Sequence, residues 1–386
     1  MKILFAPDSF KGSLKSSQII ERLVIKARQQ FKDCEILRVP IADGGEGTVE
    51  AIVSAANGEI RTLNVMGPLM GEVVAKYGVI GGDTVIIEMA EASGITLVDT
   101  EKRNPLNSTS YGTGQLIRHV LNEGYRKIII GIGGSATNDG GIGAMQALGV
   151  KFLDSAGKEV GMTGRYLEEI ADIDISGLDA CISEAEITVM CDVDNPLTGE
   201  EGATFVYGPQ KGAESDGLLR LENGMKNYAR VIKEKLDVDI SSVGGAGAAG
   251  GLGAALMVFL GARLKPGIET LLDLISFDEL LKDVDLVVTG EGKLDSQSVH
   301  GKVPIGVARR CKKHSIPVIA IVGGMDKGTD PIYDYGIESV ISTVNGIMSL
   351  EQALENAVEL LDDAAERMFR FLKVGMVIGG KSIKKL

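Results

Sequence analysis

Residues 127–141 run Lys-Ile-Ile-Ile-Gly-Ile-Gly-Gly-Ser-Ala-Thr-Asn-Asp-Gly-Gly, a short apolar stretch at residues 127–132 followed by a loop of glycines and polar side chains. A continuous apolar run of this length is typical of a strand that is buried on both faces of a parallel sheet. The pattern recurs along the chain, with glycines or acidic residues after each run. The other apolar runs lie at residues 3–6, 37–41, 286–288 and 318–322.

Helical patterns lie between these runs. In residues 16–31, apolar side chains recur at intervals of three and four, and serines at the start can cap a helix. Similar stretches occupy residues 114–121, 251–264, 304–314 and 350–372. Strands that alternate with helices predict an α/β fold built on a parallel sheet.

Residues 64–95 depart from this alternation. Their short apolar runs are joined by tight turns such as Gly81-Gly82-Asp83, which is typical of antiparallel hairpins. The strand–helix alternation returns after about residue 285. We therefore predict a discontinuous first domain, residues 1–65 plus 285–386, into which residues 66–284 are inserted as a second α/β domain with antiparallel hairpins. A plain division into two consecutive halves is the alternative that the pattern leaves open.

The composition excludes several classes of protein. The chain carries 40 basic and 53 acidic side chains, a net charge of −13, and only 4% aromatic residues, which argues against binding to nucleic acid. No apolar stretch is long enough to span a membrane, and the apolar run at the N-terminus is too short for a signal peptide. We therefore expect a cytoplasmic protein without a membrane partner, and the composition leaves a homo-oligomer open.

Cysteines and histidines are few and scattered, whereas glycine is abundant. Cys34, Cys181, Cys191 and Cys311 form no CxxC motif, so we expect neither a disulfide framework nor a structural zinc site. With only three histidines and no G-x-S-x-G motif, a Ser-His-Asp enzyme is not expected. The 51 glycines against 10 prolines predict many tight turns where the backbone approaches other groups closely.

Two glycine motifs match known ligand loops outside their usual context. Residues 375–382 match the phosphate-loop pattern G-x-x-x-x-G-K-S, but only four residues remain after them to form the helix that would hold phosphates. Residues 245–250 match G-x-G-x-x-G without a clear buried strand before them. We expect the first match to be fortuitous and the second to allow close packing at a helix start, where an anion is left open.

Acidic side chains and lysines gather where the predicted strands end, which is the edge where open parallel sheets bind ligands. Carboxylates, lysines and glycine-rich loops together are what magnesium-assisted phosphoryl transfer requires. For any one of these residues, a helix cap or a turn is the alternative role. The acids are Asp8, Asp43, Glu46, Asp139, Asp192, Asp194, Glu291 and Asp295, and the lysines are Lys11, Lys293 and Lys302.

Five sequence blocks resemble the bacterial glycerate kinase family, in order and over essentially the whole chain. The resemblance implies an enzyme that phosphorylates D-glycerate with ATP and Mg²⁺, in many members to 2-phosphoglycerate. It also implies a Rossmann-like parallel-sheet domain with a second α/β domain inserted into it, and we expect the active site in the cleft between the two. The blocks are Ala6-Pro-Asp-Ser-Phe-Lys-Gly-Ser13, Pro40-Ile-Ala-Asp-Gly-Gly-Glu-Gly-Thr48, Gly131-Ile-Gly-Gly-Ser-Ala-Thr-Asn-Asp-Gly-Gly141, Cys191-Asp-Val-Asp-Asn-Pro-Leu197 and Thr289-Gly-Glu-Gly-Lys-Leu-Asp-Ser-Gln-Ser298.

The catalytic roles are assigned from sequence position. We predict Asp295 as the general base, with Asp8 and Asp43 as rivals, because phosphoryl transfer asks only for a positioned carboxylate beside the attacking hydroxyl. Lys293 or Lys302 would neutralise charge on the transferring phosphoryl group. A turn-capping role is the alternative for Asp295.

The binding roles follow the same logic. A glycine-rich turn whose amides can face an anion is assigned to the nucleotide phosphates. A pair of carboxylates at i, i+2 is assigned to the metal. The alternatives are a capping loop at the former and an Asx turn at the latter. We predict the nucleotide at Gly133, Gly134, Ser135 and Glu291, the substrate at Ser9, Lys11, Asp43, Glu46 and Lys302, and the metal at Asp192 and Asp194.

A second class of function stays open at this stage. A non-catalytic two-lobed binding protein or sensor for a small hydroxy acid would share the same α/β halves. The number of acidic loops favours the kinase, because an anion sensor gains nothing from many carboxylates. A nicotinamide dehydrogenase is disfavoured by the missing context of its fingerprint motif.

Overall fold

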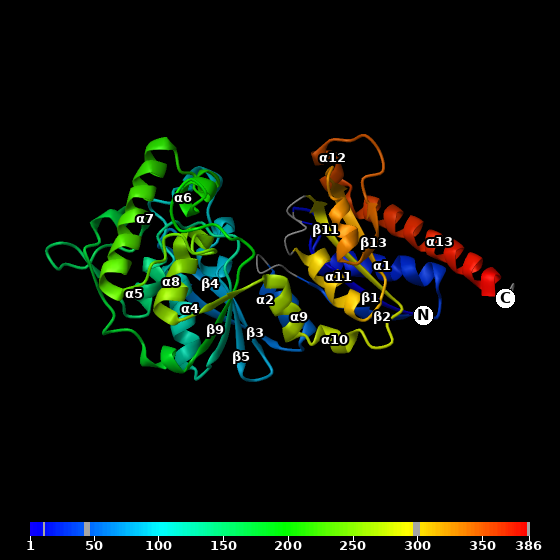
Figure 1. Ribbon diagram of the computed structural model, residues 1–386, viewed down its shortest axis with the longest axis horizontal. Helices are drawn as coiled ribbons and strands as arrows, with labels where there is room; N and C mark the ends of the chain where they lie inside the picture. Colours follow the sequence, from blue (N-terminus) through cyan, green and yellow to red (C-terminus); the bar gives the residue numbers. More distant parts are fainter. Residues whose placement is uncertain (11, 42–46, 296–301, 384–386) are drawn as a thin grey trace. The chain divides into compact units, whose positions relative to one another are not determined.

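The computed structural model describes residues 1–10, 12–41, 47–295 and 302–383. The chain forms two compact units, each with a sheet of its own (Figure 1). The first unit comprises residues 1–43 and 268–386, and the second comprises residues 44–267. The chain thus changes unit at 43/44 and 267/268, whereas the sequence analysis placed the changes near 65 and 285. No helix in the described part of the chain is long and apolar enough to cross a membrane.

Residues 47–65 fall in the second unit because of their packing. The Cβ of an alanine at Gly78 in β4 (Glu72–Ile80) would lie 2.4 Å from Cγ2 of Val53 in α2 (Thr48–Ala55), so α2 packs directly on that strand. Strand β3 (Glu59–Met66) pairs along its whole length with β4, starting from Glu59 opposite Val79. Both contacts tie this segment to the second sheet.

The first unit contains a five-stranded parallel sheet in the order β13-β12-β11-β1-β2. Its central strands carry fully buried apolar side chains, among them Ile3 and Phe5 of β1 and Val288 of β11. The order reverses between β1 and β11, because the chain moves from β1 to β2 on one side and returns to β11 on the other. The strands are β1 (Lys2–Pro7), β2 (Glu35–Arg38), β11 (Leu286–Leu294), β12 (Val318–Met325) and β13 (Ile337–Ser342).

Helices cover this sheet, and the last of them extends further than expected. The predicted helix over residues 350–372 is two helices, and the second runs on to Ile383 through the segment 375–382. The phosphate-loop match therefore lies inside a helix and cannot form a phosphate-binding loop. The helices are α1 (Ser16–Gln30), α9 (Gly267–Leu274), α10 (Phe277–Leu280), α11 (Val303–Lys313), α12 (Leu350–Glu355) and α13 (Ala357–Ile383).

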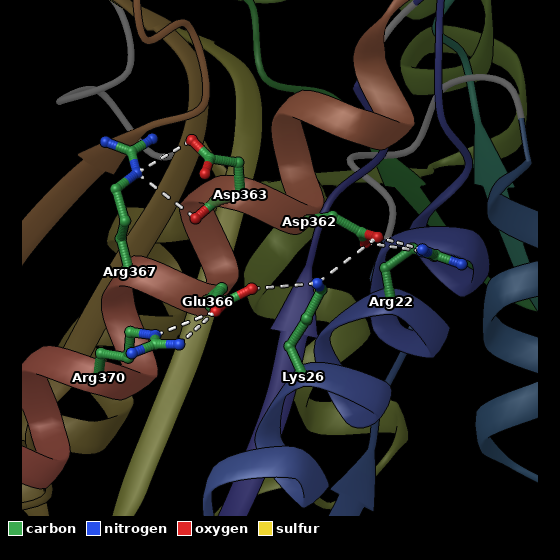
Figure 2. A network of polar contacts seen from close by, with 7 residues as sticks. All are labelled: Arg22, Lys26, Asp362, Asp363, Glu366, Arg367 and Arg370. Atoms are coloured by element: carbon green, nitrogen blue, oxygen red, sulfur yellow. Dashed lines mark hydrogen bonds and ion pairs between the residues drawn. The ribbon is translucent and has the colours of Figure 1, made fainter.

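Helices α1 and α13 are joined by a line of ion pairs (Figure 2). Arg22 of α1 donates through Nε to Oδ1 of Asp362 at 2.7 Å and forms a second hydrogen bond to the other oxygen. Lys26 lies 3.5 Å from Oε2 of Glu366, which also accepts from Arg370 one turn further along α13. Beneath these pairs, Phe369 packs edge-on against Phe5.

The second unit contains a six-stranded mixed sheet in the order β10-β9-β6-β5-β4-β3. Strands β3, β4 and β5 form antiparallel hairpins, and β5, β6, β9 and β10 are parallel. A two-stranded antiparallel sheet, β7 with β8, lies apart from it in the topology. The strands are β3 (Glu59–Met66), β4 (Glu72–Ile80), β5 (Thr84–Glu88), β6 (Lys127–Gly131), β7 (Lys151–Leu153), β8 (Asp172–Asp174), β9 (Glu186–Met190) and β10 (Arg263–Lys265).

The helices of this unit enclose one large core. Phe152 contacts the rings of Tyr228 and Phe259 edge-on, with centroids 5.9 and 5.8 Å away. The α/β class predicted from the sequence is confirmed for both units. The helices are α2 (Thr48–Ala55), α3 (Ala90–Ser93), α4 (Tyr111–Asn122), α5 (Ile142–Ala147), α6 (Ala203–Tyr207), α7 (Ser215–Leu236) and α8 (Leu252–Leu260).

The glycine run at residues 245–251 packs backbone against backbone. A Cβ at Gly250 would lie 2.1 Å from the carbonyl oxygen of Thr137, and one at Gly247 would lie 2.2 Å from that of Pro196. Distances this short leave no room for any side chain. The interpretation of these glycines as packing residues before α8 is therefore correct.

Candidate active site

In the first unit, two buried carboxylates lie where the strand order reverses. Asp8 follows β1, and its N–H donates to the carbonyl of Gly290 in β11 at 2.8 Å, so Asp8 adjoins Glu291 across the two strands. Asp8 and Glu291 are 6% and 5% exposed. In open parallel sheets, ligands bind outside the carboxyl ends of the strands at such a reversal. This edge is therefore the strongest candidate site in the unit.

Strand β11 is longer than the sequence predicted. The expected strand stopped at residue 288, but Lys293 pairs in register with Gly324 and Leu294 with Met325. Glu291 and Lys293 therefore lie within a strand and not in a loop after it. The apolar signal ended early because this extension is charged and glycine-rich, and only its partner β12 holds it in the sheet.

Lys293 forms an ion pair at this edge that the sequence analysis missed. Its Nζ lies 2.8 Å from Oδ2 of Asp326, directly after β12, and this hydrogen bond raises the pKa of Lys293. The N–H of Asp326 donates to the carbonyl of Leu294, so the residue after β12 is held against the end of β11. Asp326 could have been found by the rule that identified Asp295, because it also follows an apolar run with glycines between.

Asp295, the predicted base, lies next to Lys302, a predicted substrate residue. The ammonium of Lys302 donates to Oδ1 of Asp295 at 3.1 Å, and the side chains of Lys302 and Asp295 are 35% and 26% exposed. Lys302 directly precedes α11, and residues 296–301 between the pair lie outside the described residues. A carboxylate and an ammonium thus stand together at the end of β11, both accessible to solvent.

The remaining predicted substrate residues are only partly described. The N–H of Ser9 donates to Oδ1 of Asp8 at 2.6 Å, so this residue shares the end of β1 with that carboxylate. Lys11, Asp43 and Glu46 lie outside the described residues.

In the second unit, the loop after β6 is mostly interior. Gly134 is exposed and has a φ of +73°, a conformation that side chains with a Cβ rarely adopt. Its carbonyl accepts from the N–H of Ile95 at 2.8 Å, and the N–H of Ala136 donates to the carbonyl of Ser93 at 2.9 Å. Among the predicted nucleotide residues here, Gly133 and Gly134 reach solvent, whereas Ser135 is buried.

Asp139 anchors this loop from the inside. It is fully buried and accepts hydrogen bonds from the N–H and Oγ of Ser110, at 2.7 and 2.8 Å, and from the N–H of Gly141 at 3.1 Å. Burial raises its pKa, because desolvation outweighs these hydrogen bonds. The carboxylate of Asp139 is therefore an internal anchor of the loop, bonded to the backbone just before α4 and α5 and buried away from solvent.

The predicted metal residues follow β9 in a segment without regular structure. Asp192 and Asp194 are exposed, and Oδ1 of Asp192 accepts from the N–H of Gly267 at 2.7 Å. Within the described ranges, no three or more His, Cys, Asp or Glu side chains are grouped as a metal cluster. Two carboxylates with water and phosphate oxygens are nevertheless the usual protein share of a Mg²⁺ site, so the donor chemistry of this pair fits.

Glu88 is a further buried carboxylate that the sequence analysis did not single out. It ends β5 and is 1% exposed. Its two oxygens accept from the N–H groups of Gly47 and Val49, at 3.0 and 3.3 Å, at the start of α2. Glu88 therefore anchors the chain immediately after the Asp43–Glu46 segment.

Acid–lysine pairs at the carboxyl ends of parallel strands, as found in the first unit, are typical of enzymes that act on small molecules. Comparison with known proteins gives the family. The glycerate kinase family model matches residues 3–373, so the chain belongs to the glycerate kinase family, as the resemblance predicted.

Several relatives are similar over almost their whole length. The chain is 49% identical to glycerate 2-kinase of Escherichia coli K12, covering 97% of this chain and 99% of that protein. It is 46% identical to glycerate kinase of Bacillus subtilis 168, covering 97% and 98%. A crystal structure described as glycerate kinase 2 of Salmonella typhimurium LT2 is 48% identical, with a TM-score of 0.85 over 97% of this chain and 99% of that one.

Proposed function

We propose that this protein transfers the γ-phosphate of ATP to D-glycerate in the cytoplasm, with 2-phosphoglycerate as the product. The observation that carries the proposal is the match of nearly the whole chain, at 49% identity, to a protein named glycerate 2-kinase. The family match over residues 3–373 includes every strand-end segment described above, so the local chemistry is expected to be shared.

Asp295 is the general base in this proposal. Phosphoryl transfer needs an acceptor for the hydroxyl proton and positive charge near the phosphoryl oxygens. Asp295 and Lys302, 3.1 Å apart, place both at the end of β11. Lys293 adds a second cation from within β11. Asp8, at the end of the neighbouring strand β1, is the rival base.

The substrate and the nucleotide are assigned to different segments. We assign the glycerate carboxylate to Ser9, Lys11 and Lys302, with Asp43 and Glu46 toward its hydroxyls. We assign the phosphates of ATP to the Gly133–Ser135 turn, with Glu291 as a further contact. Gly133 and Gly134 are the members of that turn that reach solvent, so their backbone amides are the groups on offer.

Asp192 and Asp194 are the residues we assign to magnesium. When bound, Mg²⁺ neutralises charge on the phosphate oxygens. The two side chains are exposed and two residues apart, and the hydrogen bond from Gly267 to Asp192 fixes the direction of one of them.

A coupled assay of ADP release with D-glycerate tests the proposal. We expect turnover that requires both ATP and D-glycerate, that stops in EDTA and that returns with added Mg²⁺. Phosphorus NMR of the product should show 2-phosphoglycerate. Binding of D-glycerate without any ADP release would instead support a sensor, and activity that persists in EDTA would refute the metal assignment. A 3-phosphoglycerate signal would overturn the product.

A further inference from the structure

A buried lysine lies behind the predicted nucleotide turn. Lys211 ends a short 3-10 helix, Pro209–Lys211, and is 2% exposed. Its Nζ donates to Oγ of Ser135 at 2.7 Å and to the carbonyl oxygen of Thr137 at 2.6 Å. A lysine is almost never fully buried unless it has partners, so its position calls for a role.

The backbone around Lys211 is rigid enough to direct its side chain inward. The N–H of Lys211 donates to the carbonyl of Gly208 at 3.0 Å, and Gly212 follows with a φ of +89°. A Cβ at Gly212 would lie 2.3 Å from the carbonyl oxygen of Arg103, so this turn accepts only glycine there. The side-chain ammonium of Lys211 is therefore held at a fixed position in the interior.

The groups that surround Lys211 set its charge. Asp139, which anchors the same loop, is the acid whose charge favours the ammonium, and Arg103 lines the same narrow pocket as Lys211. Tyr228 of α7 faces Asp139 with its pKa raised by burial, so it stays a neutral phenol. Desolvation lowers the pKa of Lys211 to about 7, although the charge of Asp139 opposes the shift.

We infer that Lys211 is a positioning residue for the nucleotide turn: its ammonium holds Ser135 and Thr137 so that the amides of Gly133 and Gly134 keep the geometry that phosphates require. The inference rests on the proposed nucleotide site and adds a residue that no local motif suggests. Lys211 acts through the loop, because it is buried behind it and both of its hydrogen bonds end on it.

The geometry of the nucleotide turn then depends on the charge of the Lys211 amine. Loss of the Lys211 proton removes a donor from the side chain and the charge that strengthens both hydrogen bonds. Because its pKa is about 7, this loss falls within the working range of most enzymes. We expect the KM for ATP to rise as the pH increases from about 6 to about 8.5, with a smaller change in the KM for D-glycerate.

The test compares Lys211→Met and Lys211→Arg with a matched control, Lys233→Met. Lys233 lies in α7 of the same unit, is 63% exposed and pairs with the exposed Asp239. We expect Lys211→Met to raise the KM for ATP about tenfold with a smaller change in kcat. Lys211→Arg should recover part of this loss and abolish the rise with pH, because a guanidinium stays charged. The control should behave as the wild type.

Hydrogen exchange gives a second readout that does not depend on nucleotide. The amides of Ile95 and Ala136 hold the loop to the last residue of α3 and to the segment that follows it, and we expect both to exchange roughly tenfold faster or more in Lys211→Met. Unchanged exchange would overturn the positioning role even if kinetics change. Faster exchange with an unchanged KM for ATP would overturn the nucleotide assignment of the turn instead. If Lys211→Met does not fold, the arginine variant and the pH series carry the test, and a KM for ATP that is independent of pH in the wild type would refute the inference.

Discussion

Asp295 in the first unit and Asp139 in the second both follow a buried parallel strand, and each is coupled to a lysine, but their surroundings differ. Asp295 is 26% exposed and meets Lys302 at the sheet edge, where solvent and a ligand can reach it. Asp139 is fully buried, and three N–H or O–H donors of its own unit occupy its oxygens. The same pattern of residues thus yields an accessible acid–base pair in one unit and an internal anchor in the other.

The difference shows that burial decides what a charged pair can do. An exposed carboxylate beside an ammonium can exchange its partner for a substrate at little cost, because water screens both charges. A buried carboxylate cannot give up its hydrogen bonds without leaving donors unpaired in the interior. Substitutions at Asp295, at Asp139 and elsewhere in the two units test this contrast.

Asp295→Asn should have the largest effect. The amide keeps the shape and hydrogen-bonding capacity of the carboxylate but cannot accept the hydroxyl proton. We expect kcat to fall by about 10²–10⁴ with modest changes in both KM values and in the melting temperature. Steady-state kinetics with D-glycerate and ATP provide the measurement. Activity within a few-fold of the wild type would clear Asp295 and transfer the role to Asp8.

Asp139→Asn should act on stability and its pH dependence. Since burial raises the pKa of Asp139 in the folded state, the fold favours the protonated carboxyl. This contribution is complete below the unfolded value near 3.8 and is lost as the pH rises through the folded pKa. The variant should therefore gain on the wild type by up to about 1.4 kcal/mol per pH unit above about pH 4.

Urea unfolding of both proteins from about pH 4 to about pH 6 measures the Asp139 effect and stays below the titration of Lys211. Asp326→Asn, a half-exposed acid in the first unit, is the control and should show little change. A difference between wild type and Asp139→Asn that does not vary with pH would contradict the assignment of Asp139 as a buried titrating anchor.

Gly134→Val should weaken nucleotide binding more modestly. The φ of +73° is unfavourable for a β-branched residue, so the exposed turn must distort. We expect the KM for ATP to rise by roughly three- to tenfold. Gly157→Val introduces the same strain, at a φ of +77° with open space around it, and serves as the control. An unchanged KM for ATP would place the nucleotide elsewhere.

Arg22→Ala should have the smallest effect. The Arg22–Asp362 pair is two-pronged but partly exposed, at 36% and 19%. Pairs of this kind contribute about 0.2–1 kcal/mol, and salt screens them. We expect a loss in that range by urea unfolding, shrinking at about 0.5 M NaCl. A loss several times larger would mean that the ion pairs between α1 and α13 behave like buried charges.

Much of the fold could be predicted because its signals are local. The strands predicted at residues 3–6 and 127–132 agree closely with β1 and β6, since an apolar run bounded by glycine-rich loops is typical of a buried strand. The hairpins β3–β4 and β4–β5 followed from their turn glycines. The charged end of β11 was missed, because Lys293 and Leu294 are held by pairing with β12 and not by their own propensity.

The candidate site was harder to predict, because partners come from distant positions. Asp295 and Lys302 lie seven residues apart, and the sequence suggested both. Lys211 reaches Ser135 across 76 residues from a short turn without any motif, so nothing local in the sequence joins them. The sequence suggested a capping role for Asp139 but did not indicate that the side chain is completely buried. That burial depends on how α4 and α8 pack around it.

The insertion has a consequence for how the chain is made. In the first sheet, the N–H of Lys2 donates to Oδ2 of Asp285, 283 residues later, and Ile3 pairs with Leu286 of β11. Strand β1 therefore has no neighbour on that side until the chain is three-quarters synthesised. At about 5–20 residues per second, translating the intervening unit takes roughly 10–50 s. The second unit can fold on the ribosome during that delay, whereas β1, with α1 and β2, must wait. Chaperones that bind nascent apolar segments are therefore expected to act on the N-terminal segment that holds β1, α1 and β2 first.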